Sequence, residues 1–227
     1  MADPDRLKAA AAERALSLVR PGMLIGLGTG TTAAYFIEGV GRLVRGGISL
    51  SAVATSSSTA ARAQALGIKL LDRIDRPIDL AVDGADEIDP DLNLIKGRGG
   101  ALLREKLVAA AASRFVVIAD ESKLVRRLGR GPIPVEIAPF LWEQTVQRLL
   151  RHGTRCAIRG GDKPLLTDNG NLIADLEIEG GVQDPPALDR ILKGTLGAVE
   201  HGLFCGLATG CIVARENGVS VSGVLDD

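Results

Sequence analysis

The sequence has few aromatic residues and almost no net charge. Aromatic side chains make up 3% of the 227 residues while hydrophobic residues make up 46%, so a large core is possible but must be aliphatic. The 27 basic and 28 acidic residues leave a net charge of −1, which offers no general attraction for nucleic acid or for a membrane surface. An anionic ligand would therefore have to be held by a local site.

The features that mark secreted and membrane proteins are also missing. Cys156, Cys205 and Cys211 form no C-x-x-C pair, and their odd number favours a reducing compartment without disulfides. The first residues do not form a secretion signal, and no apolar run approaches the ~20 residues that a membrane span needs. The sequence thus predicts a cytoplasmic protein with neither a nucleic-acid partner nor a membrane partner.

Histidine is scarce as well. His152 and His201 are not spaced, from each other or from a cysteine, as metal ligands would be. We therefore expect no metal site and no Ser-His-Asp triad. Acid–base chemistry in this chain would have to use carboxylates and lysines.

What the sequence does contain is an alternation of strands and helices. This alternation predicts a parallel sheet with right-handed crossovers. Polar segments follow the predicted strands at their carboxyl ends, which share one edge in an open parallel sheet and bind ligands there. These segments are Thr29 to Thr32, Ser56 to Ser58, Asp83 to Glu87 and Asp120 to Lys123.

The pattern changes after a plausible linker at residues 129–132. The order strand-helix-strand-strand-helix-strand over residues 133–204 suggests a ferredoxin-like unit, in which Asn169-Gly170 is a hairpin signal. A last hairpin at residues 211–221 could rejoin the first sheet. We predict an α/β fold with two domains. They are a Rossmann-like open parallel sheet domain (residues 1–130 and 208–227) and a smaller α+β ferredoxin-like domain (residues 131–207).

The threonine turn (residues 28–32) joins a predicted strand to a predicted helix. Backbone N–H groups in such a turn can bind an anion. Thr31 stands where a dinucleotide fingerprint has its third glycine, the second strand carries no acidic residue, and no Gly-Lys-Ser/Thr follows. Two interpretations stay open, a phosphate site or a tight turn without a ligand.

The acidic turn (residues 83–87) carries three carboxylates, on Asp83, Asp86 and Glu87. Turn formation accounts for one Asp and for Gly84, but it explains all three acids less well. Carboxylates this close repel one another unless cations or substrate hydroxyls lie between them. A functional role is therefore favoured.

The glycine turn (residues 97–100) follows Lys96 and opens a predicted helix. Lys96 could be a solvated lysine, or a charge directed at a phosphate or oxyanion. Arg98 could face solvent or contact a phosphate. Glu105 lies one turn into the helix, where the helix dipole favours acids in any case. Lys123 adds a cation at another strand end, which fits a phosphate ligand.

Several stretches share their order and spacing with one known family. They are Thr29-Gly30-Thr31-Thr32, Asp83-Gly84-Ala85-Asp86-Glu87, Lys96-Gly97 with Gly99-Gly100-Ala101, Arg104-Glu105-Lys106, Ser122-Lys123, Pro134-Val135-Glu136 and Thr167 to Asn171. Together they resemble the ribose-5-phosphate isomerase family of type A over nearly the whole chain. The acidic and lysine stretches carry most of the specificity, because other sugar-phosphate binders share the threonine turn. Arg98 is a departure, since the family usually has glycine there.

The resemblance implies an aldose–ketose isomerase that interconverts D-ribose 5-phosphate and D-ribulose 5-phosphate through an enediolate, within the non-oxidative pentose phosphate pathway. It implies no cofactor and no metal, and a homodimer or homotetramer. Glu105 would be the general base, with Asp83, Asp86 and Lys96 as the other catalytic residues. The implied substrate-binding residues are Thr29, Gly30, Thr31, Thr32, Asp83, Gly84, Ala85, Asp86, Lys96, Gly97, Arg98, Gly99 and Lys123.

Two other functions compete with this one. A non-catalytic sugar-phosphate sensor domain would share the threonine turn but would not need Glu105, and it would be expected to carry a DNA-binding segment. A coenzyme A transferase-like enzyme would use a glutamate as a nucleophile. It would form a covalent thioester instead of exchanging a proton with solvent.

Overall fold

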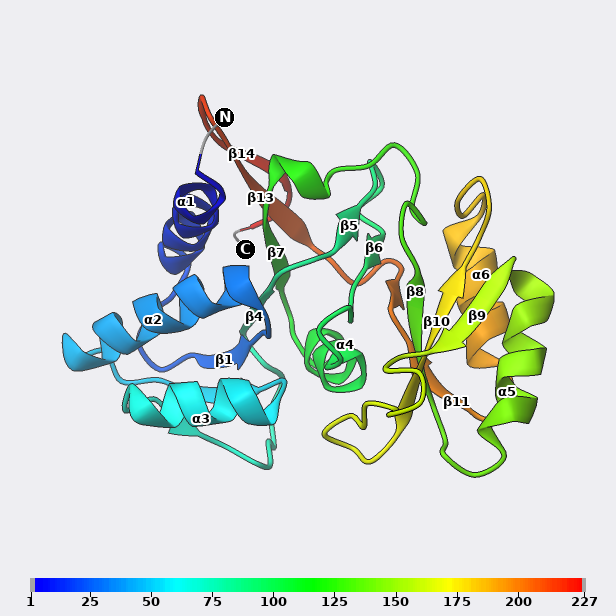
Figure 1. Ribbon diagram of the computed structural model, residues 1–227. Helices are drawn as coiled ribbons and strands as arrows, with labels where there is room; N and C mark the ends of the chain where they lie inside the picture. Colours follow the sequence, from blue (N-terminus) through cyan, green and yellow to red (C-terminus); the bar gives the residue numbers. More distant parts are fainter. Residues whose placement is uncertain (1–2, 226–227) are drawn as a thin grey trace. The chain divides into compact units, whose positions relative to one another are not determined.

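The computed structural model describes residues 3–225, and this part of the chain forms two compact units (Figure 1). Unit 1 contains the chain up to Ala85, Arg104–Lys123, and the chain from Gly206 on. Unit 2 contains Asp86–Leu103 and Leu124–Cys205. The predicted fold class, an open and mostly parallel sheet with a smaller ferredoxin-like α+β part, is confirmed.

Unit 1 is built on a seven-stranded sheet with the order β14-β13-β7-β4-β1-β2-β3. Its strands are β1 (Leu24–Leu27), β2 (Ser51–Ala54), β3 (Lys69–Leu70), β4 (Leu80–Asp83), β7 (Phe115–Asp120), β13 (Gly210–Arg215) and β14 (Gly218–Gly223). Neighbouring strands are parallel except β13 and β14, which form the predicted last hairpin. This hairpin rejoins the first sheet, because β13 pairs with β7.

Helices α1 (Pro4–Leu16), α2 (Thr31–Arg45) and α3 (Ser57–Ala65) pack on this sheet through a hydrophobic core. Unit 1 also contains α4 (Leu102–Ala110, in unit 1 from Arg104 on) and the 3-10 helix η1 (Glu121–Lys123), in which no residue is buried. Ala11 of α1 and Phe36 of α2 are fully buried in the same core as Val116 of β7. Among residues 3–225, no helix is both long and apolar enough to cross a membrane.

Unit 2 contains an antiparallel sheet with the order β11-β8-β10-β9. Its elements are β8 (Ile133–Ile137), α5 (Trp142–Leu149), η2 (Leu150–His152), β9 (Arg155–Ile158), β10 (Leu172–Glu177), α6 (Pro185–Lys193) and β11 (Ala198–His201). This is the predicted ferredoxin-like order. Alternate residues of β8, such as Val135, pack with Leu149 of α5 and Leu192 of α6, so one face of the sheet carries both helices (Figure 1).

The unit boundaries differ from the predicted domain boundaries. Residues 86–103 and 124–130 belong to unit 2, although the sequence placed them in the first domain. The reason is a small sheet with the order β12-β6-β5, formed by β5 (Glu87–Ile88), β6 (Leu94–Ile95) and β12 (Leu203–Phe204). Strands of two residues carry no readable periodicity, so this pairing could not be predicted.

The Asn169-Gly170 signal marks a tight turn rather than a hairpin between two strands. Gly170 has a φ of 76°, and the Thr167 N–H donates to the Asn171 carbonyl at 2.9 Å. The turn lies within the connection between β9 and β10. Its side chains turn toward the fully buried Glu136, whose Oε1 accepts from Thr167 Oγ1 at 2.9 Å and from Asn171 Nδ2 at 2.9 Å.

Candidate active site

Hydroxyl groups hold the threonine turn in unit 1. Thr29 Oγ1 lies 2.7 Å from Thr55 Oγ1, 2.8 Å from Ser56 Oγ and 3.0 Å from Thr59 Oγ1. The Thr29 N–H donates to Asp83 Oδ1 at 3.0 Å. The turn after β1 is therefore joined both to the end of β2 and to the end of β4. Sequence reasoning missed Thr55 and Thr59, although polar residues after a strand were the signal that pointed to this region.

The threonine turn leads directly into α2. Gly30 has a φ of 114°, a conformation that an L side chain rarely adopts, and it is the N-cap residue of the helix. Thr31 and Thr32 are the first residues of α2, and no acidic residue lies in its first turn. The N–H groups of this helix end suit an anion such as a phosphate.

Asp83 ends β4 and is 3% exposed. Its Oδ1 accepts from the Thr29 N–H and from the Gly84 N–H, the latter at 2.7 Å. A side chain at Gly28 would overlap the Asp83 carboxylate, which explains why glycine is needed at that position of the turn. The structure thus places Asp83 against the backbone of the threonine turn.

Glu105 lies in the first turn of α4, as predicted, and is 5% exposed. It lines a small cavity of unit 1, without room for a water molecule, together with Gly26, Gly28, Thr55, Ala81, Val82, Asp83, Val108, Ala109 and Phe115. Two carboxylates beside one buried cavity repel each other unless a proton or donors lie between them. Such a pair suits proton transfer better than it suits a purely structural role.

Lys123 belongs to η1, which follows β7. Because β7 runs parallel to β4 in register with it, the residues after β7 lie at the same sheet edge as Asp83. Asp120 Oδ1 accepts from the Ser122 N–H at 3.0 Å and so shapes the turn that carries Lys123. The expected gathering of polar strand ends is therefore found in unit 1.

Asp86 and Lys96 lie in unit 2. The Asp86 N–H donates to the Ile95 carbonyl at 2.8 Å, which links the acidic turn to β6. Lys96 is 2% exposed, and its Nζ lies 5.7 Å from the centre of the Phe204 ring. A buried lysine over an aromatic face is not the solvated lysine of the simpler interpretation.

Arg98 contacts both acids that end the acidic turn. Its backbone N–H donates to Asp86 Oδ2 at 3.0 Å, and its side-chain Nη2 donates to Glu87 Oε1 at 2.5 Å. Glu87 is fully buried and also accepts from the N–H groups of Gly129, at 2.8 Å, and Gly131, at 2.8 Å. The guanidinium of Arg98 thus has a carboxylate partner, which neither interpretation from the sequence had included.

Arg159 is a residue of this region that the sequence did not reveal. It follows β9, and its Nη1 donates to the carbonyls of Gly97, at 3.1 Å, and Arg98, at 2.9 Å. The rest of its guanidinium donates to Asp175 of β10. An arginine at the end of a strand carries no sequence signal that would have connected it with the glycine turn.

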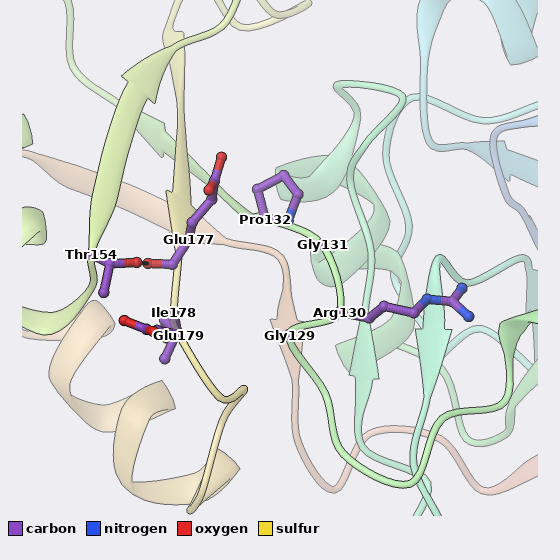
Figure 2. A pocket seen from close by; sticks show the side chains of 8 residues that line it. All are labelled: Gly129, Arg130, Gly131, Pro132, Thr154, Glu177, Ile178 and Glu179. Carbon is purple, nitrogen blue, oxygen red and sulfur yellow. Dashed lines mark hydrogen bonds between the residues drawn. The ribbon is translucent and has the colours of Figure 1, made fainter.

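Residues 129–132 also line an open pocket of unit 2, with a volume of about 460 Å³ (Figure 2). Thr154, Glu177, Ile178 and Glu179 form the rest of its lining. Figure 2 shows the Arg130 side chain extending away from Glu177 and Glu179. The two glutamates of this lining disfavour a phosphate, since Glu177 already pairs with Arg155 at 3.3 Å, and none of the predicted site residues is part of the lining.

Two of the three thiols, those of Cys156 and Cys211, are poorly suited to nucleophilic chemistry. Burial raises the pKa of Cys211 to about 12. Burial, and then the charge of Asp175, raise the pKa of Cys156 to about 11. Both thiols are therefore protonated at neutral pH and poor nucleophiles. Within residues 3–225, no group of three or more His, Cys, Asp or Glu side chains could hold a metal ion.

The predicted site residues thus fall into two groups. Unit 1 carries Thr29, Gly30, Thr31, Thr32, Asp83, Gly84, Ala85, Glu105 and Lys123, and unit 2 carries Asp86, Lys96, Gly97, Arg98 and Gly99. Within unit 1, the structure brings Thr29, Asp83 and Glu105 together. Within unit 2, it brings Asp86 and Arg98 together.

Known proteins resemble this chain over almost its full length. A family model described as ribose 5-phosphate isomerase A (phosphoriboisomerase A) matches residues 51–218. Ribose-5-phosphate isomerase A of Bradyrhizobium diazoefficiens is 47% identical over 231 residues, covering 96% of this chain and 95% of the relative. The solved ribose 5-phosphate isomerase from Plasmodium falciparum has a TM-score of 0.92 and 38% identity, covering 97% of this chain and 99% of that chain. A solved D-ribose-5-phosphate isomerase in complex with phospho-erythronic acid has a TM-score of 0.92 and 39% identity, covering 98% of this chain and 100% of that chain.

Proposed function

This chain belongs to the ribose 5-phosphate isomerase A family, and we propose that it interconverts D-ribose 5-phosphate and D-ribulose 5-phosphate through an enediolate. One observation carries the proposal: Asp83 and Glu105 are both buried beside the same cavity, at the sheet edge that also carries the threonine turn. Family membership names the reaction, and this pair of carboxylates supplies groups that can move its protons. The complex of a related isomerase with phospho-erythronic acid, a phosphorylated polyhydroxy compound, supports a sugar-phosphate ligand for this chain.

Glu105 is the general base of the proposed mechanism. A C–H bond beside a carbonyl is a weak acid, so its proton needs a positioned base and stabilisation of the charge that develops on oxygen. Glu105 removes the proton from C2 of the aldose, exchanges it with solvent, and delivers a proton to C1, which forms the ketose. Its position in the first turn of α4, with 5% exposure, holds the carboxylate in a fixed and largely dry environment.

We assign proton transfer among the sugar hydroxyls, and opening of the sugar ring, to Asp83 and Asp86. Lys96 is the cation that stabilises the enediolate oxygens in this proposal. Its burial supports this role, because a charge is more effective where water is excluded.

The threonine turn and Lys123 are the proposed phosphate-binding elements. The N–H groups of Thr31 and Thr32 at the start of α2 would donate to the phosphate, and Lys123 would add a positive charge. A held phosphate converts remote binding energy into the orientation of C1 and C2. Gly84, Ala85 and the glycine turn complete the proposed substrate contacts.

The proposal is tested by incubating the protein with D-ribose 5-phosphate in D₂O, with and without EDTA, and following the product by NMR. We expect D-ribulose 5-phosphate with deuterium at C1, at a rate that EDTA does not change. Binding of the sugar phosphate without any turnover would instead favour the sensor function. A glutamyl thioester formed with an acyl-coenzyme A would favour the transferase.

We also propose that the protein acts in the non-oxidative pentose phosphate pathway, in the cytoplasm, as a homodimer or homotetramer. Cys156, Cys205 and Cys211 form no disulfide, which supports a reducing compartment. Phe140 and Leu196, which are 83% and 75% exposed, support self-association. Their turns are joined by the hydrogen bond from the Ala138 N–H to the Gly197 carbonyl at 2.9 Å. Size-exclusion chromatography with light scattering measures the assembly directly.

A further inference from the structure

The glycine turn needs support from outside itself. Gly97 and Gly100 have φ values of 93° and 90°, and glycine loses more conformational freedom on folding than any other residue. Within the turn, the Gly100 N–H donates to the Gly97 carbonyl at 3.0 Å. A flexible turn of this kind keeps one shape only if neighbouring groups hold its peptide bonds.

Arg159 provides such support. Its Nη1 donates to two successive carbonyls of the turn, those of Gly97 (3.1 Å) and Arg98 (2.9 Å). Its Nε donates to Asp175 Oδ2 at 2.9 Å, and its Nη2 donates to Asp175 Oδ1 at 2.5 Å. A bidentate carboxylate fixes the plane of a guanidinium, so Asp175 determines where Arg159 can donate. The two side chains are 17% and 22% exposed, which reduces competition from water.

The two carbonyl contacts also determine where the N–H groups of the turn point. All peptide bonds of the described residues are trans, and the C=O and N–H of a trans peptide point in opposite directions. Holding the Gly97 carbonyl therefore directs the Arg98 N–H to Asp86 Oδ2, at 3.0 Å. Holding the Arg98 carbonyl directs the N–H of the exposed Gly99 away from Arg159. One guanidinium thus controls the direction of two donors, one of which positions the Asp86 carboxylate.

We propose that Arg159, held by Asp175, is a positioning residue for the isomerisation: it keeps the glycine turn in the conformation that orients Asp86 and presents the Gly99 N–H to the substrate. This inference rests on the proposed function, because it takes Asp86 and the glycine turn as parts of the substrate site.

The kinetic test compares Arg159→Gln with Arg155→Gln. Arg155 is the first residue of β9, which Arg159 directly follows, and it also pairs with an acid of β10, Glu177, at 3.3 Å, but its side chain is 69% exposed. We expect Arg159→Gln to lower kcat/KM about 100-fold, the scale of effect that a small misplacement of reacting groups produces. Arg159→Lys should recover little of this loss, since an ammonium cannot hold two carbonyls and both oxygens of Asp175. Arg155→Gln should stay within about twofold of the unmodified protein.

A second measurement does not depend on activity. Hydrogen–deuterium exchange should become faster at the Arg98 and Gly100 amides in Arg159→Gln and in Asp175→Asn, while it stays unchanged in Arg155→Gln. A merely structural role for Arg159 would lower Tm but leave kcat and KM of the folded fraction intact. That result, or unchanged exchange in the glycine turn, would overturn the inference.

The remaining outcomes are also decisive. If Arg159→Gln does not fold, Arg159→Lys and Asp175→Asn carry both measurements. If the unmodified protein does not isomerise pentose phosphates, the proposed function fails. In that case the exchange of the Arg98 and Gly100 amides still decides whether Arg159 holds the turn.

Discussion

The threonine turn of unit 1 leads into α2 and the glycine turn of unit 2 leads into α4, but different interactions hold the two turns. Short hydroxyl side chains and the Asp83 carboxylate hold the threonine turn, between strands that are neighbours in the sheet. Charged side chains hold the glycine turn: Arg159 Nη1 donates to two of its carbonyls, and Asp86 Oδ2 accepts from the backbone N–H of Arg98. The first turn is thus supported by neighbouring strands of its own parallel sheet, and the second by hydrogen bonds from a charged side chain that lies about 60 residues further along the chain.

The largest effect is expected in unit 1, where we assign the general base to Glu105. Glu105→Gln keeps the shape of the side chain but removes the base, so kcat should fall roughly 1,000-fold, within the range typical of general base catalysis. KM should change little. Glu143→Gln is the matched control, because Glu143 also lies in the first turn of a helix but is exposed. Stopped-flow or coupled assays measure both variants, and near-normal turnover of Glu105→Gln would disprove the assignment.

The next test breaks the ionic support of unit 2. Glu87 is fully buried and accepts from Arg98 through Oε1 and from the Gly129 N–H through Oε2. In Glu87→Gln, the new amide NH₂ replaces one of these two acceptor oxygens. It then faces an N–H donor, so one buried hydrogen bond is lost along with the negative charge. We expect a loss of about 3 kcal/mol in the free energy of unfolding.

Thermal and urea unfolding measure this loss against Glu38→Gln. Glu38 pairs with Arg62 at 3.0 Å, but both side chains are nearly half exposed. An exposed pair contributes about 0–1 kcal/mol, so the control should unfold almost normally. Equal stability of the two variants would mean that the buried ion pair does not support the glycine turn.

A steric change should break the threonine turn. A methyl group at Gly28 would overlap the Asp83 carboxylate, so Gly28→Ala should cost about 1–3 kcal/mol of folding stability through overpacking. Gly84→Ala is the control for stability, because its nearest atoms would lie 3.8 Å away. If urea unfolding gives the same midpoint for both variants, Asp83 does not press on the turn as described.

The smallest effect concerns the proposed phosphate contact. Lys123→Ala removes one charge-assisted contact, which should raise KM about tenfold and leave kcat nearly unchanged. Lys69, an exposed lysine of β3, provides the control variant Lys69→Ala. Initial rates over a wide range of ribose 5-phosphate separate the two parameters. An unchanged KM in Lys123→Ala would argue against a phosphate role for this lysine.

Much of the fold followed from local patterns in the sequence. Periodicity and turn residues predicted the parallel sheet, the ferredoxin-like order and the last hairpin, and strand ends predicted where polar residues gather. The residues that hold the two turns were harder to find. Thr59 and Arg159 act across 30 and 62 residues of chain, to Thr29 and to Gly97, and no local pattern marks such partners.

The sequence by itself determined the strand and helix order, the placement of Glu105 in the first turn of its helix, and the family to which the chain belongs. Each depends on residues close together in the chain, or on an order of motifs that can be read directly from the sequence. Tertiary structure alone decided that Arg98 pairs with Glu87, that Arg159 holds the glycine turn, and that Asp83 and Asp86 belong to different units. The physical reason is that a long charged side chain takes its partner from whatever the folded chain places within hydrogen-bonding distance, and long-range packing determines that choice.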